Sequence, residues 1–336
     1  MLHKIKHTFL YLLIFPALSL FLYNCSSSES SDCTQTWYQD NDGDGLGNPN
    51  ATSTACERPL GYVDNGNDTD DTKHAYDDTN TLEIPSEGYT TPTHYDGMTM
   101  IWSDEFEGNS LNTDYWTFQT GDGCPGNCGW GNNELEFYSA NNTSLENGYL
   151  VIEAKEENAG GKNYTSSRIT TQGKFTVNYG RIDVRAALPE GQGIWPAIWM
   201  LGENITEVSW PACGEIDIME MVGGDGKENT VHGTAHWDHE GNYASYGQGF
   251  TLSEGTFKDA FHVFSIVWNS ETITWYVDDE QFNVIDTTPE ALSEFQNDFH
   301  LLLNLAVGGN WPGAPDTTTT FPQFFIVDYV RVFQEN

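Results

Sequence analysis

From about residue 97 to residue 336 the chain reads as a succession of short β-strands with almost no helical pattern. Runs rich in Val, Ile, Tyr and Phe, several of them alternating with polar residues, predict strands at 149–155, 180–186, 262–268, 273–277 and 326–333. Turn signals such as Asn147-Gly148 and Asp278-Asp279 separate the runs, and only 289–296 invites a helix. No period indicates a propeller or a solenoid. We therefore expect an all-β fold, a single large β-sandwich.

One of these strand-like runs, residues 215–220, carries three carboxylates in six positions: Glu215, Asp217 and Glu220. A strand sends alternate side chains to opposite faces, so Glu215 and Asp217 share a face, whereas simple alternation turns Glu220 away. One extra residue, a β-bulge near Ile218-Met219, would bring Glu220 back to that face, and bulges often re-aim a side chain beside an active site. The motif therefore predicts a catalytic row.

The spacing also suggests a reaction class. With the bulge, Glu215 and Glu220 are effectively four residues apart, which is about 13 Å between Cα atoms at ~3.3 Å per residue. Two Glu side chains that lean together across a concave sheet shrink this to a carboxyl separation of roughly 5 to 6 Å, the range of retaining glycosidases. A structural acidic strand that binds an ion is the competing interpretation.

The N-terminus predicts export. Lys4 and Lys6 precede an apolar run over residues 9–23, which has the layout of a secretory signal and is short for a membrane-spanning helix. Cys25 follows at once, and residues 1–24 resemble a bacterial lipoprotein signal peptide that makes Cys25 the lipidated first residue of a Ser-rich tether, 25–32. We expect a lipoprotein of the outer membrane or cell surface, with simple secretion as the alternative and the lipid at Cys25 as the only membrane contact.

The net charge of the chain limits the classes of molecule that it can bind. The chain has 50 acidic and 13 basic residues and a formal net charge of −37, so nucleic acid and anionic lipid surfaces would repel it. Aromatic residues make up 13% of the chain and include 11 Trp, whose rings stack well on sugars when they are exposed. We expect a monomer that binds a polysaccharide.

Export allows disulfides among the cysteines that follow Cys25. Cys33 and Cys56 bracket a small acidic region, and Cys124 and Cys128 bracket a Pro-Gly-Asn turn, so these are the two predicted pairs. Cys213 is left as a small buried apolar residue, although a bond to Cys124 or Cys128 stays open.

Residues 33–80 form a separate acidic region. Alternate oxygen-bearing residues with intervening glycines suit Ca²⁺, and the residues concerned are Asp40, Asp42 and Asp44, followed by Asp68, Asp70 and Asp71. The first cluster resembles half of an EF-hand loop, but no Glu stands at the twelfth position, and the region looks more like a thrombospondin type 3 calcium repeat. We expect a small calcium-binding module held by ion and disulfide, with a disordered acidic spacer as the alternative. Prolines and a glycine in 81–95 indicate a linker.

Six stretches, in order along residues 96–336, resemble glycoside hydrolase family 16 in its laminarinase-like form. They are Gly129-Trp-Gly-Asn-Asn-Glu134, Tyr179-Gly-Arg-Ile-Asp-Val-Arg185, Gly193-Ile-Trp-Pro-Ala-Ile-Trp199, Glu215-Ile-Asp-Ile-Met-Glu220, Val231-His-Gly-Thr-Ala-His-Trp237 and Asn304-Leu-Ala-Val-Gly-Gly-Asn-Trp-Pro-Gly313. The resemblance implies a concanavalin A-like jelly-roll β-sandwich with a sugar-binding cleft on its concave face. It also implies endo-hydrolysis of a β-1,3-glucan such as laminarin with retention of configuration.

The resemblance assigns roles to individual residues. Glu215 matches the nucleophile, Glu220 the acid and base, and Asp217 the carboxylate between them. Because a like charge raises a carboxyl pKa, we expect Glu215 and Asp217 to keep Glu220 protonated in the free enzyme. Predicted sugar contacts are Asn132, Arg168, Trp195, Trp199, Trp210, His236 and Trp311. His232 shares a strand face with His236, and the preference between them is slight. Arg181 and Arg185 fit paired surface charges equally well.

The resemblance further implies a structural, non-catalytic Ca²⁺ on the convex side, bound by oxygens of Glu107, Gly148 and Asp328. Two other classes of function stay open. A non-catalytic carbohydrate-binding surface protein is one, and intact Glu215 and Glu220 argue against it. A same-fold enzyme that acts on mixed-linkage glucan, agarose or carrageenan, or that transfers instead of hydrolysing, is the other. Few basic residues are present to grip sulfated chains, which favours an uncharged glucan.

Overall fold

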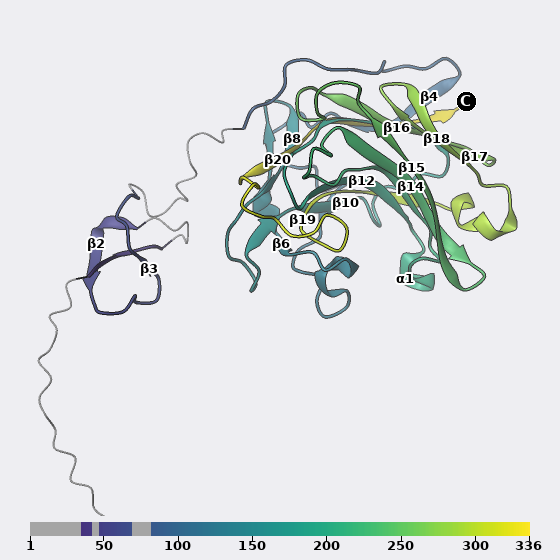
Figure 1. The fold of residues 1–336 in the computed structure, drawn as a ribbon. Coiled ribbons are helices and arrows are strands. Elements are labelled where there is room, and N and C mark those ends of the chain that lie inside the picture. Colours follow the sequence, from purple (N-terminus) through teal and green to yellow (C-terminus); the bar gives the residue numbers. More distant parts are fainter. Residues whose placement is uncertain (1–34, 42–46, 69–81) are drawn as a thin grey trace, which may run out of the picture.

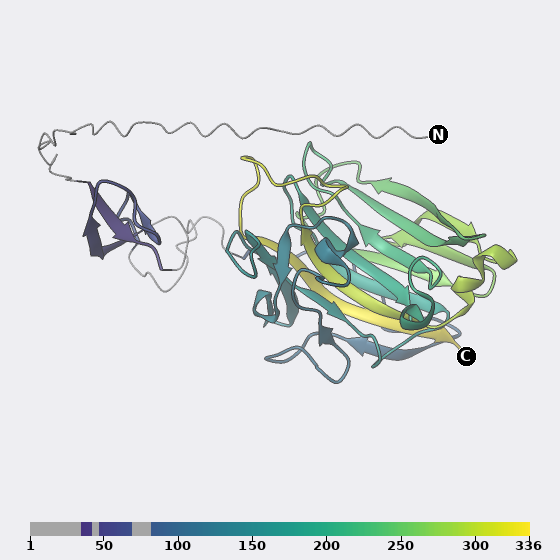
Figure 2. The same cartoon turned by 90° about the horizontal axis from the view of Figure 1, so that it is seen from below.

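Two curved sheets packed face to face make up most of the computed structural model, which describes residues 35–41, 47–68 and 82–336 (Figure 1). One sheet has seven antiparallel strands. Their order is β15 (Asn242–Thr251), β14 (Thr230–His239), β13 (Glu215–Glu220), β12 (Ile194–Gly202), β19 (Phe299–Val307), β10 (Arg168–Thr170) and β5 (Thr117–Phe118). The view from below in Figure 2 shows the strands lying side by side with a marked curvature.

The second sheet has eight strands. Their order is β18 (Glu280–Asp286), β17 (Thr272–Val277), β16 (His262–Trp268), β11 (Gly180–Ala187), β20 (Gln323–Glu335), β8 (Tyr149–Ala154) and β7 (Thr143–Glu146), with β4 (Met98–Asp104) also paired to β20. Shorter elements lie in the connections: β6 (Glu136–Tyr138) and β9 (Tyr164–Ser166), which pair in parallel, α1 (Ile205–Val208), and the 3₁₀ turns η1 (Cys128–Gly131), η2 (Ala140–Asn142) and η3 (Glu290–Gln296).

A single large apolar cluster fills the space between the sheets. Alternation along the strands explains it: in β11, Ile182, Val184 and Ala186 point into the cluster, and Arg181 and Asp183 point out. By the same alternation, the face of the seven-stranded sheet that points away from the core can carry polar side chains. This arrangement confirms the predicted all-β sandwich.

The five predicted strands are all present, as β8, β11, β16, β17 and β20; β16 has the predicted bounds, and the ends of the others differ by three residues at most. The helical segment predicted at 289–296 is η3, a 3₁₀ turn rather than an α-helix. Cys213 is fully buried with a free thiol, as expected.

Residues 82–95 lie in the span that composition indicates as a linker, and they run in extended form over the outer face of the eight-stranded sheet. Leu82 and Ile84 pack against a small apolar cluster on that face. Gly88 bridges to Phe261 so closely that an added Cβ would lie 2.1 Å from the Phe261 oxygen. Tyr95 donates a 2.7 Å hydrogen bond to Asp183. These contacts attach the segment to the sandwich.

Within the region 33–80, the described residues contain a three-stranded antiparallel sheet of β2 (Asn48–Thr54), β1 (Thr36–Gln39) and β3 (Tyr62–Val63). Asp40 follows β1 directly, and Asp68 is buried. Cys56 is disulfide-bonded. Outside the described residues lie Asp42, Asp44, Asp70, Asp71, Cys33 and Cys25, together with the predicted signal peptide and tether. Calcium binding and lipid attachment stay predictions. Within the described part of the chain, no helix has the length and apolar character to cross a membrane.

Candidate active site

The bulge predicted at Ile218-Met219 is present in β13. On the β12 side, Met219 pairs with Ile198 and Asp217 pairs with the next residue, Trp199. Ile216, Ile218 and Met219 all enter the core, whereas Glu215, Asp217 and Glu220 face away from it. Glu215 pairs with Leu201 and Glu220 with Ala197, so the two glutamates face positions four residues apart on β12. This confirms that the bulge returns Glu220 to the face of Glu215.

The opposite sheet supports the bulge from within the core. A bulge takes backbone groups out of the ladder, and here the Asp217 carbonyl accepts a 2.8 Å hydrogen bond from the indole of Trp275 on β17. Gly233 on β14 makes room for that ring, because an added Cβ would lie 2.5 Å from Trp275. The kink in β13 is thus fixed by contacts across the sandwich.

The carboxylate row is connected to a histidine on the neighbouring strand. The Nε2 atom of His236 lies 2.8 Å from Asp217 Oδ2 and 3.7 Å from Glu215 Oε1, and its Nδ1 atom lies 2.8 Å from the Tyr243 hydroxyl. At the other end of the row, the Trp195 indole donates to Glu220 at 3.1 Å. Of the two histidines on this face, His236 is the one hydrogen-bonded to the row, whereas His232 packs against the Trp311 ring.

All three carboxyls have raised pKa values. Burial, followed by the charge of Asp217, raises the pKa of Glu215 to about 8, while His236, Trp210 and Arg168 pull it down. Burial also raises the pKa of Asp217. The pKa of Glu220 lies well above its usual range because of burial first and the charges of Asp217 and Glu215 second. The raised pKa expected for Glu220 is confirmed, and the like charges that we expected contribute to it, but burial contributes more.

A cleft of ≈ 630 Å³ opens above this row on the face of the seven-stranded sheet. Its floor comes from residues of β12 and β19 that point away from the core, and its rim from the loop at residues 126–132 and from Ser209 and Trp210. The predicted contacts Asn132, Arg168, Trp195, Trp199 and Trp210 line this cleft together with the three carboxyls. The structure therefore brings these predicted site residues together.

Aromatic side chains stand at both ends of the row. Beside Glu220, Trp195 meets Trp311 edge to face at 5.6 Å, and Trp195 itself is buried whereas Trp311 is 45% exposed. Beside Glu215, Trp210 is 47% exposed and lies 5.2 Å from the Tyr243 ring. Trp210 and Trp311 thus present open ring surface as predicted, and Trp195 mainly holds Glu220 and Trp311.

Arg168 and Asn132 belong to a packed polar network. The Arg168 guanidinium lies between the rings of Trp130 and Trp199, 4.6 and 4.7 Å from their centroids. Asn132 donates to Glu134, which also accepts from the Tyr138 hydroxyl. A chain of hydrogen bonds continues from Tyr138 through Asn304 to the Trp199 indole, as Asn304 donates to Tyr138 at 3.1 Å and accepts from Trp199 at 2.7 Å. Arg168 therefore positions the cleft floor in addition to lining the cleft.

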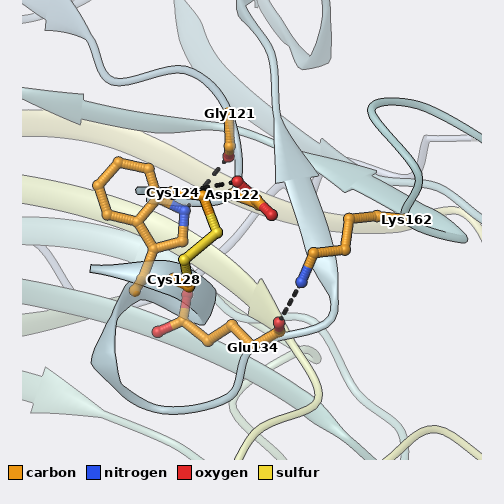
Figure 3. Close-up of a disulfide and its surroundings, with 7 residues drawn as sticks. Gly121, Asp122, Cys124, Cys128, Glu134 and Lys162 are labelled. Carbon is orange, nitrogen blue, oxygen red and sulfur yellow. Dashed lines mark hydrogen bonds between the residues drawn. A yellow bond between two sulfur atoms is a disulfide. The ribbon is translucent and has the colours of Figure 1, made fainter. Parts of the chain in front are cut away.

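The loop that carries Asn132 is held by the Cys124–Cys128 disulfide, as predicted (Figure 3). The Trp130 indole donates to the Gly121 carbonyl, and Lys162 donates to the main-chain oxygen of Glu134 at 2.9 Å. These contacts close the loop on itself and tie it to its neighbour. The cleft rim on this side is thereby held in place.

The residues predicted for a convex-side Ca²⁺ come from three adjacent strands. Asp328 lies in β20. On one side of it, Val327 pairs with Leu150 of β8, two residues after Gly148. On the other, Val330 pairs with Asp104 at the end of β4, three residues before Glu107. Glu107 is exposed, and the Asp328 carboxylate is engaged by Arg185 at 2.6 Å. The pairing brings the three chain segments to one region of the sheet, but Arg185 engages the Asp328 carboxylate, and this calcium site stays a prediction. Arg181 and Arg185 are paired charges on the outer face.

Within the described residues, Glu215, Asp217 and His236 form a group tight enough to hold a metal ion. The hydrogen bond between Asp217 and His236 already joins the two closest members of that group. Four residues of the site were not predicted from the sequence: Trp130, Glu134, Tyr243 and Asn304. Trp130, Glu134 and Asn304 stand inside the motifs quoted above, so a signal was present, whereas Tyr243 reaches the site only through the pairing of β15 with β14.

Comparisons with known proteins agree with this geometry. The β-glucanase of Rhodothermus marinus is 41% identical over 249 residues, covering 70% of this chain and 85% of that protein. The laminarinase catalytic domain of Thermotoga maritima MSB8 has a TM-score of 0.67 at 47% identity, covering 71% of this chain and 99% of that domain. The clotting factor G alpha subunit of Tachypleus tridentatus is 38% identical over 246 residues, and the chain spans only 35% of its length. The model of glycosyl hydrolases family 16 matches residues 127–330, and the chain belongs to that family.

Proposed function

We propose that this protein is a retaining endo-glycosidase that hydrolyses a β-1,3-glucan of the laminarin type. The observation that carries the proposal is the bulged row of Glu215, Asp217 and Glu220 at the floor of an open, aromatic-lined cleft. Two carboxyls on the same face of one strand can flank one glycosidic bond, the arrangement that double displacement requires. The predicted carboxyl separation is consistent with retention.

In the first step the Glu215 carboxylate attacks the anomeric carbon while the Glu220 carboxylic acid gives its proton to the departing glycosidic oxygen. The C–O bond to the leaving sugar breaks, and an ester bond to Glu215 forms. Burial raises the pKa of both carboxyls, that of Glu215 to about 8, but their charged neighbours differ. Asp217 alone adds a like charge beside Glu215, where Arg168 opposes it, whereas both Asp217 and Glu215 raise the pKa of Glu220, so Glu220 is the glutamate favoured to hold the proton.

In the second step, water attacks the anomeric carbon and passes a proton to the Glu220 carboxylate, and the ester bond to Glu215 breaks. Once Glu215 is esterified, one negative charge next to Glu220 has gone, so Glu220 can remain ionised until it accepts that proton. Two inversions give net retention.

The cleft favours an uncharged glucan chain bound in its middle. Exposed rings of Trp210 and Trp311 offer stacking surfaces on either side of the row, and the one arginine in the cleft lining is enclosed by two indole rings. Names of relatives, a β-glucanase and a laminarinase catalytic domain, support the same substrate class. Attachment to a cell surface through Cys25 belongs to the same proposal and would place the enzyme where polysaccharide arrives from outside.

Incubation of the purified protein with laminarin, lichenan, agarose and κ-carrageenan tests the substrate. We expect laminarin to be cut to short oligosaccharides from the start of the reaction, with the new reducing ends first appearing as the β-anomer by proton NMR. Release of oligosaccharides from agarose or carrageenan alone would overturn the substrate, and an α-anomer as first product would overturn the mechanism. Tight binding without cleavage would favour a carbohydrate-binding protein.

A further inference from the structure

We propose that Tyr243 is a positioning residue that holds His236 as its neutral tautomer with the proton on Nε2, so that His236 donates a hydrogen bond to Asp217. Among the described residues, Tyr243 is the group on β15 that reaches the ring nitrogen of His236 facing away from the carboxylate row. This inference rests on the proposed glycosidase function and adds a residue that the catalytic motif does not contain.

Strand pairing delivers Tyr243 to the site. β14 and β15 form a long antiparallel hairpin in which Tyr243 pairs with Asp238, two residues from His236 on the same face. Its hydroxyl lies 2.8 Å from His236 Nδ1, and its ring is stacked on the imidazole with 5.7 Å between centroids and an interplanar angle of 20°. Trp210 contacts the Tyr243 ring at 5.2 Å. The imidazole is therefore held by a hydroxyl on one side and a carboxylate on the other.

The chemistry of a neutral imidazole links the two contacts. One ring nitrogen carries a proton and the other accepts, so a hydroxyl that donates to Nδ1 leaves the proton on Nε2. Nε2 lies 2.8 Å from Asp217 Oδ2 and can donate to it. A hydrogen bond to an ionised carboxylate favours the charged form of that carboxylate. Tyr243 thereby keeps the imidazole neutral and oriented, so that Asp217 receives one directed hydrogen bond from Nε2 beside Glu220, the group that must keep its proton.

Other charged groups around His236 act in the same region. From β13, Asp217, Glu215 and Glu220 all face it, and His232 stands four residues away on the same face of β14. The competing state of the ring is an imidazolium, which carries a second proton on Nδ1. A hydroxyl that donates to Nδ1 opposes that second proton, which gives Tyr243 a measurable effect separate from ring packing.

Tyr243→Phe removes the hydroxyl and keeps the ring that contacts His236 and Trp210. The matched control is Tyr246→Phe, because Tyr246 lies on the same strand, is similarly exposed and pairs with Ala235, a core residue, which places it on the opposite face. Nitrogen-15 NMR of the imidazoles, with His236→Gln to assign the signals, reports the tautomer in the free protein. The kcat/KM pH profile on laminarin reports the consequence for the reaction.

We expect His236 in the unmodified protein to have a proton-free Nδ1 at pH 7. In Tyr243→Phe the ratio of doubly to singly protonated His236 should rise about three- to tenfold, the effect of losing one hydrogen bond, and the acid limb of the kcat/KM profile should move to higher pH. Tyr246→Phe should change neither. A protonated Nδ1 in the unmodified protein, or a Tyr243→Phe variant with unchanged protonation and pH profile, would overturn the proposal. Absence of glucan cleavage by the unmodified protein would defeat the proposed function, while the NMR result would still decide the role of Tyr243.

Discussion

The two faces that the sandwich turns away from its core each carry a buried aspartate, Asp183 on the outer face and Asp217 on the concave face, but the surroundings of the two carboxylates differ. On the outer face of the eight-stranded sheet, buried Asp183 accepts 2.7 Å hydrogen bonds from Arg181, Ser265 and Tyr95. On the concave face, Asp217 has His236 as its side-chain partner, and Glu220 has the Trp195 indole. The outer charges are compensated, whereas the carboxylate row carries more acid than its surroundings neutralise.

The pKa directions follow from this contrast. Although burial opposes it, Asp279 on the outer face has a lowered pKa through Arg181 and Tyr89, and Arg181 has a raised pKa through Asp183 and Asp279. In the cleft, burial raises the pKa of every member of the row. The outer face therefore favours ionised groups and supports the fold, while the cleft holds protons that a reaction can use.

The largest expected effect is the loss of reaction chemistry without loss of structure. Glu220→Gln removes the proposed acid and should lower kcat on laminarin about 10²- to 10⁴-fold, and Glu215→Gln removes the proposed nucleophile and should lower it at least as far. Circular dichroism and thermal unfolding should show a folded protein in both cases. The exposed Glu280→Gln is the matched control and should retain full activity.

A substrate with a good leaving group distinguishes the role of Glu215 from that of Glu220. In an aryl β-1,3-glucoside oligomer, the phenol can leave without receiving a proton. Glu220→Gln should release this phenol rapidly in a first turnover, because only Glu215 is required for that step. Glu215→Gln should release none. Equal rescue of both variants would show that the roles of the two glutamates are assigned wrongly.

A second expected effect concerns the outer face. Arg181→Met leaves the carboxylate of Asp183 buried without its cation and should lower the free energy of unfolding by about 3–5 kcal/mol in urea titrations at pH 7. Because this pair lies on the sheet opposite the cleft, kcat of the folded variant should be unchanged. Arg181→Met combined with Asp183→Asn should recover part of the loss. A single variant as stable as the unmodified protein would mean that the outer charges do not support the fold.

The smallest expected effect concerns the pH dependence of stability, which should have opposite signs for carboxyls on the two faces. A carboxyl whose folded pKa is raised binds protons in the folded state after the unfolded chain has released them, so its contribution is lost as pH rises from about 4.5 to about 8. Glu215→Gln removes this loss and should be more stable than the unmodified protein at pH 8, by at least about 1 kcal/mol, with a smaller difference at pH 4.

Asp279→Asn on the outer face supplies the opposite control. Its lowered pKa contributes stability above the unfolded pKa that is lost on acidification, so the variant should be less stable at neutral pH and approach the unmodified protein in acid. Thermal unfolding across this pH range checks both variants. Parallel pH dependence in the two variants would remove the distinction between the faces.

Local pattern was enough to predict much of this molecule. Alternating Val, Ile and aromatic residues gave five strands, and the impossibility of placing Glu220 beside Glu215 by simple alternation gave the bulge. The Cys124–Cys128 bond was predictable because the two cysteines are only four positions apart and a Pro-Gly-Asn turn between them holds the thiols close. Each of these depends on neighbours in sequence.

Long-range placement was not predictable in the same way. Composition made residues 82–95 look like a linker, yet Gly88 and Tyr95 are attached to Phe261 and Asp183, far along the chain. Arg168 looked like a free sugar ligand, but two indole rings enclose it. The pKa of Glu220 was expected to follow from its neighbours' charges, but burial, which depends on the whole fold, contributes more.

The sequence by itself determined the strand pattern, the bulged carboxylate row and the acidic character of the chain, because periodicity, spacing and charge are properties of the residues in order. Only the tertiary structure decided the pKa values of those carboxyls. Trp275 from the opposite sheet holds the bulge, Tyr243 from the edge strand holds His236, and the depth of the cleft sets the desolvation. Proton affinity depends on the distance to groups remote in sequence and on the exclusion of water, and both exist only once the sheets have packed.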